Sequence, residues 1–276
     1  MAGTLYVVGT PIGNLSDITP RALETFEMVD FIACEDTRVS GKLFSHFGIK
    51  KPLVSYHEHS QKAVEDSILS RLISGENGAV VTDAGMPCIS DPGEDLVRAC
   101  AENGIDVKVV PGPSAVISAL AVSGLVTSRF TFEGFLSTTK RQRQEHLGSL
   151  KNERRTMIFY EAPHKLKTTL DDMYTFFGDR KISLCRELTK MHEEIIRTTL
   201  KGAIEMYREN SPRGEYVLVL EGSQETQETV DTIDKALQLV KELINNGMRG
   251  ADACKEIAKT TPFSKGELYT ALLSEE

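Results

Sequence analysis

Three loops that combine glycine with polar side chains each follow a short apolar segment. They comprise residues 9–14, 82–93 and 111–115. Glycine lets a ligand approach the backbone closely, and the Asp83 carboxylate could accept hydrogen bonds from a ribose or an amino group. Ser114 and Ala115 would begin a helix, whose unpaired N–H groups suit a carboxylate or a ribose hydroxyl. These loops predict a small-molecule site.

The first loop reads Gly9-Thr-Pro-Ile-Gly-Asn14 and lacks the GxGxxG spacing of dinucleotide-binding folds. This disfavours a nucleotide-dependent oxidoreductase. In the second loop, Asp91 precedes Pro92 and Gly93, an arrangement typical of a residue that caps the N-terminus of a helix. We therefore expect Asp91 to cap a helix and Asp83 to face the ligand.

The elements that position these loops alternate in type along the chain. Short segments rich in Val and Ile predict strands at 4–8, 31–34, 53–55, 79–82 and 107–110, and further strands at 130–135, 157–160, 182–185, 195–199 and 216–220. Apolar stripes between them predict helices, so the first half is expected to form an α/β layer around a mainly parallel sheet. No helix separates 182–185 from 195–199, which predicts antiparallel pairing in the second half.

These elements predict four parts of the chain: an α/β domain over 1–112, a second α/β domain over 113–222, a polar linker over 223–229 and a small helical module over 230–276. The module has helix-turn-helix dimensions. Residues 230–276 hold eight acidic against six basic residues. Both nucleic-acid binding and a plain three-helix packing unit therefore remain open.

The overall composition excludes several classes of protein. The chain has 276 residues, a net charge of −8 and 40% hydrophobic residues, which excludes a disordered chain and a globally basic nucleic-acid binder. Five cysteines without a CxxC pair argue against a zinc ribbon or a disulfide framework and favour a reducing, cytoplasmic location. The longest apolar run, 115–126, is too short to span a bilayer, and we expect no membrane association.

Eight segments together resemble the ribosomal RNA small subunit methyltransferase I family of the tetrapyrrole methylase superfamily. In order they read GTPIGNLSDITPRA, ACEDTR, SYHEHS, TDAGMPCISDPG, PGPSA, FEGF, FYEAPHK and GEYVLVLEG. The resemblance covers about residues 3–222, and the tail is similar to the family's C-terminal extension. Met86, Ser137 and Lys165 stand where the family more often has threonine, proline and arginine.

The resemblance implies two α/β domains with a cleft between them that binds S-adenosylmethionine. It further implies methylation of a cytidine 2′-hydroxyl in the decoding region of 16S ribosomal RNA, with the small ribosomal subunit as partner, a homodimer as a possible state and no metal. The cofactor residues carried over are Pro11, Asp83, Ala84, Gly85, Met86, Ser114, Ala115, Glu161, Ala162 and Tyr216.

A ribose hydroxyl needs a proton acceptor, and the candidates are His57 and Glu35. His57 and His59 also have the spacing of a metal pair on a strand, but no third ligand accompanies them. Residues 139–155 hold six basic against two acidic residues, which favours RNA contact over a solvated helix face. The predicted RNA-binding residues are Arg38, Lys140, Arg141, Arg143, Arg154 and Arg155. Two alternatives remain open: methylation of a tetrapyrrole precursor, and a non-catalytic RNA-binding or assembly protein.

Overall fold

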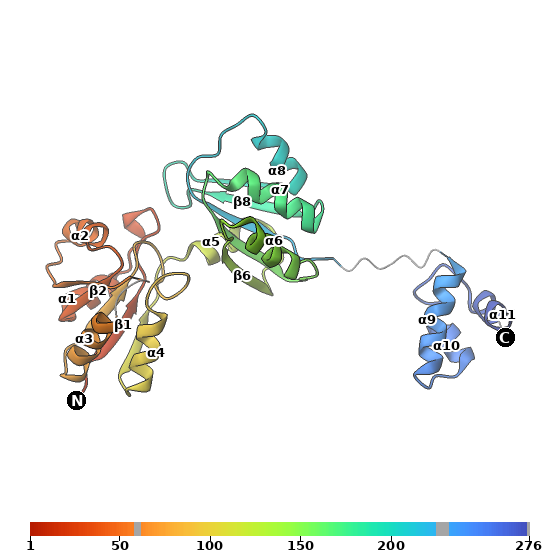
Figure 1. Cartoon of the computed structure of the whole chain (residues 1–276), viewed down its shortest axis with the longest axis horizontal. Coiled ribbons are helices and arrows are strands. Elements are labelled where there is room, and N and C mark those ends of the chain that lie inside the picture. Colours follow the sequence, from red (N-terminus) through yellow and green to blue (C-terminus); the bar gives the residue numbers. More distant parts are fainter. Residues whose placement is uncertain (58–61, 225–231, 275–276) are drawn as a thin grey trace. The chain divides into compact units, whose positions relative to one another are not determined.

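The computed structural model describes residues 1–57, 62–224 and 232–274. The chain divides into two compact units, Met1–Ser223 and Gln224–Glu276. The first unit contains two five-stranded sheets with their helices, and the second contains helices only (Figure 1). This arrangement confirms the predicted fold class, two sheets with alternating helices followed by a helical module.

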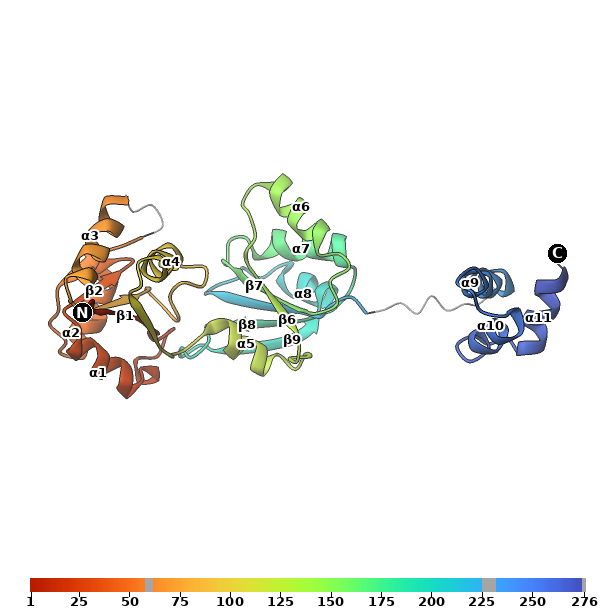
Figure 2. The same cartoon turned by 90° about the horizontal axis from the view of Figure 1, so that it is seen from below.

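The first sheet is parallel throughout, as predicted, and its strands run in the order β3-β2-β4-β1-β5. The strands are β1 (Thr4–Val8), β2 (Phe31–Cys34), β3 (Leu53–Ser55), β4 (Gly78–Val81) and β5 (Asp106–Val110). Figure 2 shows that helices α1 (Pro20–Met28) and α2 (Thr37–His46) cover one face, and α3 (Lys62–Ile73) and α4 (Glu94–Glu102) cover the other. The central strands β2 and β4 are therefore buried on both faces, which explains their continuous apolarity, whereas the edge strand β5 is mostly exposed.

The second sheet has the order β6-β7-β10-β8-β9, and all of its pairs except β6–β7 are antiparallel. Its strands are β6 (Phe130–Phe135), β7 (Thr156–Glu161), β8 (Lys181–Arg186), β9 (Glu194–Thr199) and β10 (Tyr216–Leu220). The antiparallel β8–β9 pair confirms the prediction from the missing helix between these two segments.

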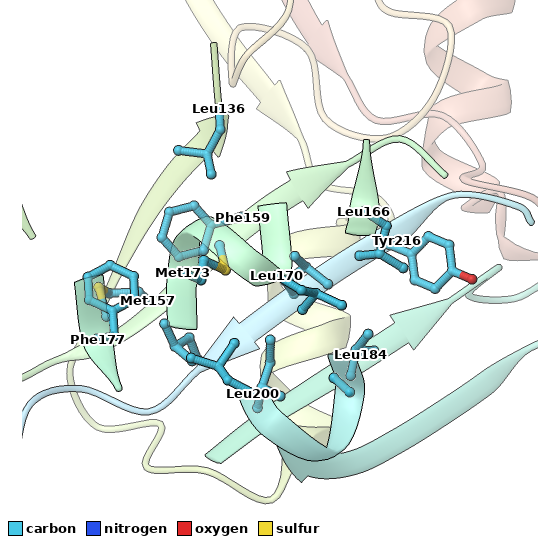
Figure 3. Packing of buried hydrophobic residues seen from close by; sticks show 14 of the residues in the cluster. Leu136, Met157, Phe159, Leu166, Leu170, Met173, Phe177, Leu184, Leu200 and Tyr216 are labelled. Atoms are coloured by element: carbon cyan, nitrogen blue, oxygen red, sulfur yellow. The ribbon is translucent and has the colours of Figure 1, made fainter. Parts of the chain in front are cut away.

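Four helices cover this second sheet. Helix α5 (Ala115–Ser123) packs on one face, and α6 (Lys140–Ser149), α7 (Leu166–Phe177) and α8 (Leu200–Tyr207) enclose a large core on the other. Figure 3 shows this core, in which Phe159 from β7 and Leu170 from α7 lie among aliphatic and aromatic side chains. The paired strands β7 and β10 are thus held by a well-packed core.

The second unit consists of α9 (Ile233–Asn245), α10 (Gly250–Ile257) and α11 (Lys265–Ser274), which share a small core that includes Val240, Cys254 and Leu268. A reciprocal capping box opens α11, because the Ser264 N–H donates to Glu267 and the Glu267 N–H donates to the Ser264 hydroxyl. Of the predicted linker, residues 225–229 lie outside the described residues. In the described ranges, no helix is long and apolar enough to cross a membrane.

Candidate active site

The three loops predicted from the sequence meet at the carboxyl edge of the first sheet. Strand β1 lies between β4 and β5, so the loops that follow these strands are neighbours. Backbone hydrogen bonds join the first two loops: the Thr10 N–H donates to the Gly85 oxygen at 2.9 Å, and the Gly85 N–H donates to the Thr10 oxygen at 3.1 Å. This edge is where open α/β sheets bind ligands.

The first and third loops approach each other at two glycines. A Cβ atom on Gly9 would lie 2.7 Å from the Cα atom of Gly112, and the reverse substitution would place a Cβ 2.8 Å from Gly9 Cα. No side chain fits at such a separation. Glycine at both positions therefore allows the loop after β1 to pack against the segment that leads into α5.

A small cavity, called cavity A here, lies where these loops meet β7. Its volume is about 40 Å³. The residues that line it are Ile12, Ala84, Gly85, Met86, Ile89, Asp91, Ser114, Ala115, Val116 and Tyr160. Five of the predicted cofactor residues are thus brought together: Ala84, Gly85, Met86, Ser114 and Ala115. The other five, Pro11, Asp83, Glu161, Ala162 and Tyr216, do not line it.

Glu161 and Tyr216 point into the core of the second sheet. The Glu161 carboxylate is 2% exposed and accepts hydrogen bonds from the Thr169 hydroxyl and the Ala162 N–H. The Tyr216 ring lies among the core side chains in Figure 3, and its hydroxyl is 3.2 Å from that of Tyr207. Neither side chain therefore lines cavity A, and contact of these two residues with the cofactor stays a prediction.

Tyr160 lines the cavity in place of Glu161, because successive residues of a strand face opposite sides of the sheet. Its ring packs against Phe132 and Phe135 with centroid distances of 5.0 and 5.2 Å. Burial, together with the charge of Asp91, raises the pKa of the Tyr160 hydroxyl to about 12. Tyr160 belongs to the segment FYEAPHK, in which an aromatic and a carboxylic residue flank it, so the sequence alone did not show which of the three faces the cavity.

Asp91 also lines cavity A and does not cap a helix, contrary to the sequence prediction. Gly93 is the N-cap of α4, with a φ of 128° and no side-chain cap. Burial raises the pKa of Asp91 to about 6, and the Glu35 and Asp83 carboxylates add a smaller increase. A hydrogen bond with Thr82 lowers the pKa and so partly offsets this effect. Burial and Glu35 also raise the pKa of Asp83. The cavity wall is therefore electronegative.

The two predicted proton acceptors lie outside cavity A. The Glu35 carboxylate accepts a hydrogen bond of 2.8 Å from the Thr82 hydroxyl, and neither residue lines cavity A. His57 is exposed and does not line cavity A. His59 lies outside the described residues. Within the described part of the chain, no three His, Cys, Asp or Glu side chains are grouped as metal ligands would be.

Of the predicted RNA-binding side chains, Arg143 is buried and the others lie at the surface. Arg143 is 8% exposed, and its guanidinium contacts Asp172 and the Ser137 and Thr138 carbonyl oxygens. Arg143 is therefore unavailable to a phosphate, which corrects that expectation. The exposed residues are Arg38, Lys140, Arg141, Arg154 and Arg155.

Three of these exposed arginines already have acidic partners. Arg38 pairs with Asp36 at 2.6 Å, and the hydrogen bonds from Arg38 hold the pKa of the Asp36 carboxyl well below its usual range. Arg141 pairs with Glu145 at 2.8 Å, and Arg155 pairs with Glu153 at 2.7 Å. Exposed pairs of this kind are weak, so they leave the arginines able to exchange partners.

The family model for tetrapyrrole (corrin/porphyrin) methylases matches residues 4–204, which include all three loops and the whole of cavity A. The chain belongs to this methylase family. A cobalt precorrin-4 methyltransferase structure covers 79% of this chain and 94% of its own, with a TM-score of 0.57 at 19% identity. The uroporphyrin-III-C-methyltransferase of Thermus thermophilus gives a TM-score of 0.55 at 20% identity, covering 79% of this chain and 94% of its own. These two structures show the tetrapyrrole methylase fold.

Curated relatives within the tetrapyrrole methylase family are much more similar in sequence. A Synechocystis protein named ribosomal RNA small subunit methyltransferase I is 47% identical over 275 residues, 99% of both chains. A protein of the same name from Thermotoga maritima is 48% identical over 222 residues, which are 80% of this chain and all of the relative. That relative is about as long as the first unit of this chain.

Proposed function

We propose that this methylase transfers a methyl group from S-adenosylmethionine to the 2′-hydroxyl of a cytidine in the decoding region of 16S ribosomal RNA. The observation that carries the proposal is the meeting of three loops at cavity A, in a chain 47% identical over 99% of its length to a protein named as a ribosomal RNA small subunit methyltransferase. The small ribosomal subunit would be the partner, the cytoplasm the location, and the two sheet-containing halves, 1–112 and 113–222, would act as separate domains joined at Pro113.

Cavity A, at about 40 Å³, would hold only part of S-adenosylmethionine, and the residues around it suit the sulfonium and amino-acid part. The cofactor would supply an electrophilic methyl group on a positively charged sulfonium. The carboxylates of Asp83 and Asp91 would favour that charge, and the N–H groups at the start of α5, which have no partner within the helix, would suit its amino-acid carboxylate. Gly85, with a φ of 90°, brings backbone rather than a side chain to the cavity.

Asp91 is the side chain we assign as the proton acceptor, in place of His57 and Glu35. It lines cavity A, and a pKa of about 6 leaves it ionised at neutral pH yet close to the operating range of a general base. The Thr82 hydroxyl donates to Glu35 in this structure, and by turning its single proton to Asp91 it would stabilise the ionised form of that carboxylate. Glu35 then acts as a positioning residue.

Ribosomal RNA would contact the exposed basic residues beside the second sheet, Lys140 and Arg141, together with Arg38 on α2. Arg38 and Arg141 side chains are each 86% exposed. Lys140 and Arg141 open α6, where the local excess of basic residues stands against the acidic balance of the whole chain. Phosphate contacts of this kind position an RNA without reading its sequence.

A labelled methyl donor tests the proposal directly. The protein is incubated with S-adenosylmethionine carrying a labelled methyl group and with small subunits that lack the modification, free 16S RNA, or a tetrapyrrole precursor. Label in RNA at a position that resists alkaline cleavage supports 2′-O-methylation, because cleavage requires a free 2′-hydroxyl. Label in the tetrapyrrole supports the small-molecule alternative. RNA binding without label in either substrate supports the non-catalytic alternative.

A further inference from the structure

A second cavity, called cavity B, shares one wall with cavity A. Its volume is about 310 Å³, at the lower end of the range of about 300–1,000 Å³ for small-molecule sites. It is lined by Ile12, Asp17, Thr19, Gly112, Pro113, Ser118 and Thr189. Ile12 lines both cavities, so a group bound in cavity B lies next to one bound in cavity A.

Two buried polar atoms in the wall of cavity B have no hydrogen-bond partner. They are the Asp17 Oδ2 and the Thr189 Oγ1, and in the described residues only two other side-chain atoms are buried and unpartnered. Leaving a buried polar atom unpaired is costly, so each such atom calls for an explanation. Two of the four belong to residues that line cavity B. These oxygens are covered in this structure, so a polar ligand in cavity B would pair with them once their side chains turn toward it.

The wall that carries Thr189 is held rigidly. Thr189 and Glu187 adopt left-handed backbone conformations, with φ of 65° and 50°. Lys190 fixes this connection between β8 and β9 through ion pairs to Glu187 at 3.0 Å and to Glu215 at 2.8 Å. A Cβ on Gly13 would lie 3.0 Å from the Thr189 hydroxyl and 2.5 Å from Lys190 Cγ, so the loop after β1 packs directly against the connection.

We propose that cavity B binds the base of the target nucleotide and that Asp17 accepts a hydrogen bond from the exocyclic amino group of cytosine. A carboxylate only accepts hydrogen bonds, and cytosine presents an N4 amino donor where uracil presents a carbonyl oxygen. Asp17 would therefore favour cytidine and reject uridine. The Thr189 hydroxyl, which can donate, would meet an acceptor of the same base. This inference rests on the proposed function.

The placement of the two cavities supports this division of roles. Five of the residues predicted for the cofactor line cavity A, whereas cavity B is lined by none of them. Methyl transfer requires donor and hydroxyl side by side, and both cavities reach Ile12, so the two ligands would meet beside this residue. A base held by Asp17 would place its own ribose toward cavity A.

The test compares methylation of small subunits that carry cytidine or uridine at the target position, which the labelled donor locates. Asp17→Asn and Thr189→Val are measured beside the wild type, and Asp171→Asn, on the exposed surface of α7, is the matched control. We expect the wild type and the control to prefer cytidine strongly in kcat/KM. Asp17→Asn should reduce that preference by about tenfold or more, the effect of losing a charged hydrogen bond, and Thr189→Val should raise KM for both RNAs. Calorimetry should show S-adenosylmethionine affinity unchanged in both variants.

An unchanged cytidine preference in Asp17→Asn would overturn the inference. So would a tenfold loss of S-adenosylmethionine affinity in that variant, because cavity B would then belong to the cofactor. A wild type that binds S-adenosylmethionine but methylates neither RNA would overturn the proposed function, and this inference with it. Circular dichroism confirms that each variant is folded before its rates are compared.

Discussion

Arg143 on α6 and Asp172 on α7 form an ion pair 2.7 Å long, in which the side chains are only 10% and 15% exposed. The same guanidinium donates to the carbonyl oxygens of Ser137 and Thr138, at 3.1 and 3.2 Å, in the turn before α6. One side chain thus joins two helices and the turn that leads into the first of them. Its charge serves the packing of the helices that cover the second sheet rather than an exposed surface.

Arg143→Ala should therefore destabilise the protein, by about 3–5 kcal/mol, because it leaves the Asp172 carboxylate buried without a partner. Urea unfolding followed by circular dichroism measures the change. The double variant Arg143→Met, Asp172→Leu should lose clearly less than the single variant, since it leaves no buried charge. An Arg143→Ala protein as stable as the wild type would show that the pair is solvated in solution.

Lys140 and Arg141 should behave in the opposite way. Replacing both by alanine should leave the free energy of unfolding nearly unchanged and weaken RNA binding. The salt dependence of binding should flatten, by roughly 0.7–0.9 in slope for each phosphate that the variant no longer neutralises. RNA affinity measured over a salt series tests this, with Lys50→Ala, Lys108→Ala as a control that removes two exposed charges elsewhere. Equal slopes for the two double variants would assign residues 140–141 to an ordinary solvated surface.

Asp91→Asn should make the protein more stable at neutral pH and less active. The folded-state pKa of Asp91 is raised from 3.8 to about 6 by burial and neighbouring carboxylates, so the fold favours the neutral form. The stability from holding that proton is present below the unfolded pKa and is lost as pH rises through about 6. Asparagine stays neutral throughout. The melting temperature of the Asp91→Asn variant should exceed that of the wild type by about 5–10 °C at about pH 7.5 and nearly match it at about pH 4.

Equal shifts at the two pH values would contradict this assignment, because they would mean that Asp91 titrates normally. The charged and titratable groups that face it are Glu35, Asp83, Cys88 and Tyr160. Full methylation activity in Asp91→Asn would remove the residue from the role of proton acceptor even if the stability result held.

Gly112→Ala should destabilise the protein, typically by about 1–3 kcal/mol for an overpacked position, and weaken S-adenosylmethionine binding. The added Cβ would meet the Gly9 backbone at 2.8–2.9 Å and push apart the two loops that join at cavity A. Gly41→Ala is the control: it lies in α2 with nothing within 4 Å, so it should be neutral or stabilising. Urea unfolding measures the stability of both variants, and calorimetry measures their affinity for S-adenosylmethionine.

The sequence predicted most of the fold because the strands of these sheets are short, apolar and separated by clear helix signals. The predicted segments 31–34 and 53–55 match β2 and β3, and the antiparallel β8–β9 pair followed from a missing helix. The site was harder to predict because every residue of β10 is buried, so no alternation showed that Tyr216 faces the core. The sequence did not distinguish the buried Arg143 from its exposed neighbours, because its partner, Asp172, lies in a different helix. Asp17 and Thr189 meet only through the tertiary fold.

The helical second unit has a core of its own, built from α9, α10 and α11, and the boundary between the units lies at Ser223. The Thermotoga maritima relative aligns over its whole length with 222 residues of this chain, so a protein of that name exists without a full counterpart of both units. We therefore expect the second unit to contribute to recognition of the assembled small subunit, through side chains such as Arg249, Lys255 and Lys265, rather than to methyl transfer.

A chain that ends after Ser223 should fold, because cavities A and B and both sheets lie within the first unit. Its S-adenosylmethionine affinity should equal that of the full chain, whereas methylation of small subunits should fall, with the loss appearing in KM rather than kcat. The matched control is the full chain with Arg249, Lys255 and Lys265 replaced by alanine, which should show part of the same rise in KM. Aggregation of the shortened chain would show that the second unit completes a core. Methylation at the full rate would show that it takes no part in recognising the subunit.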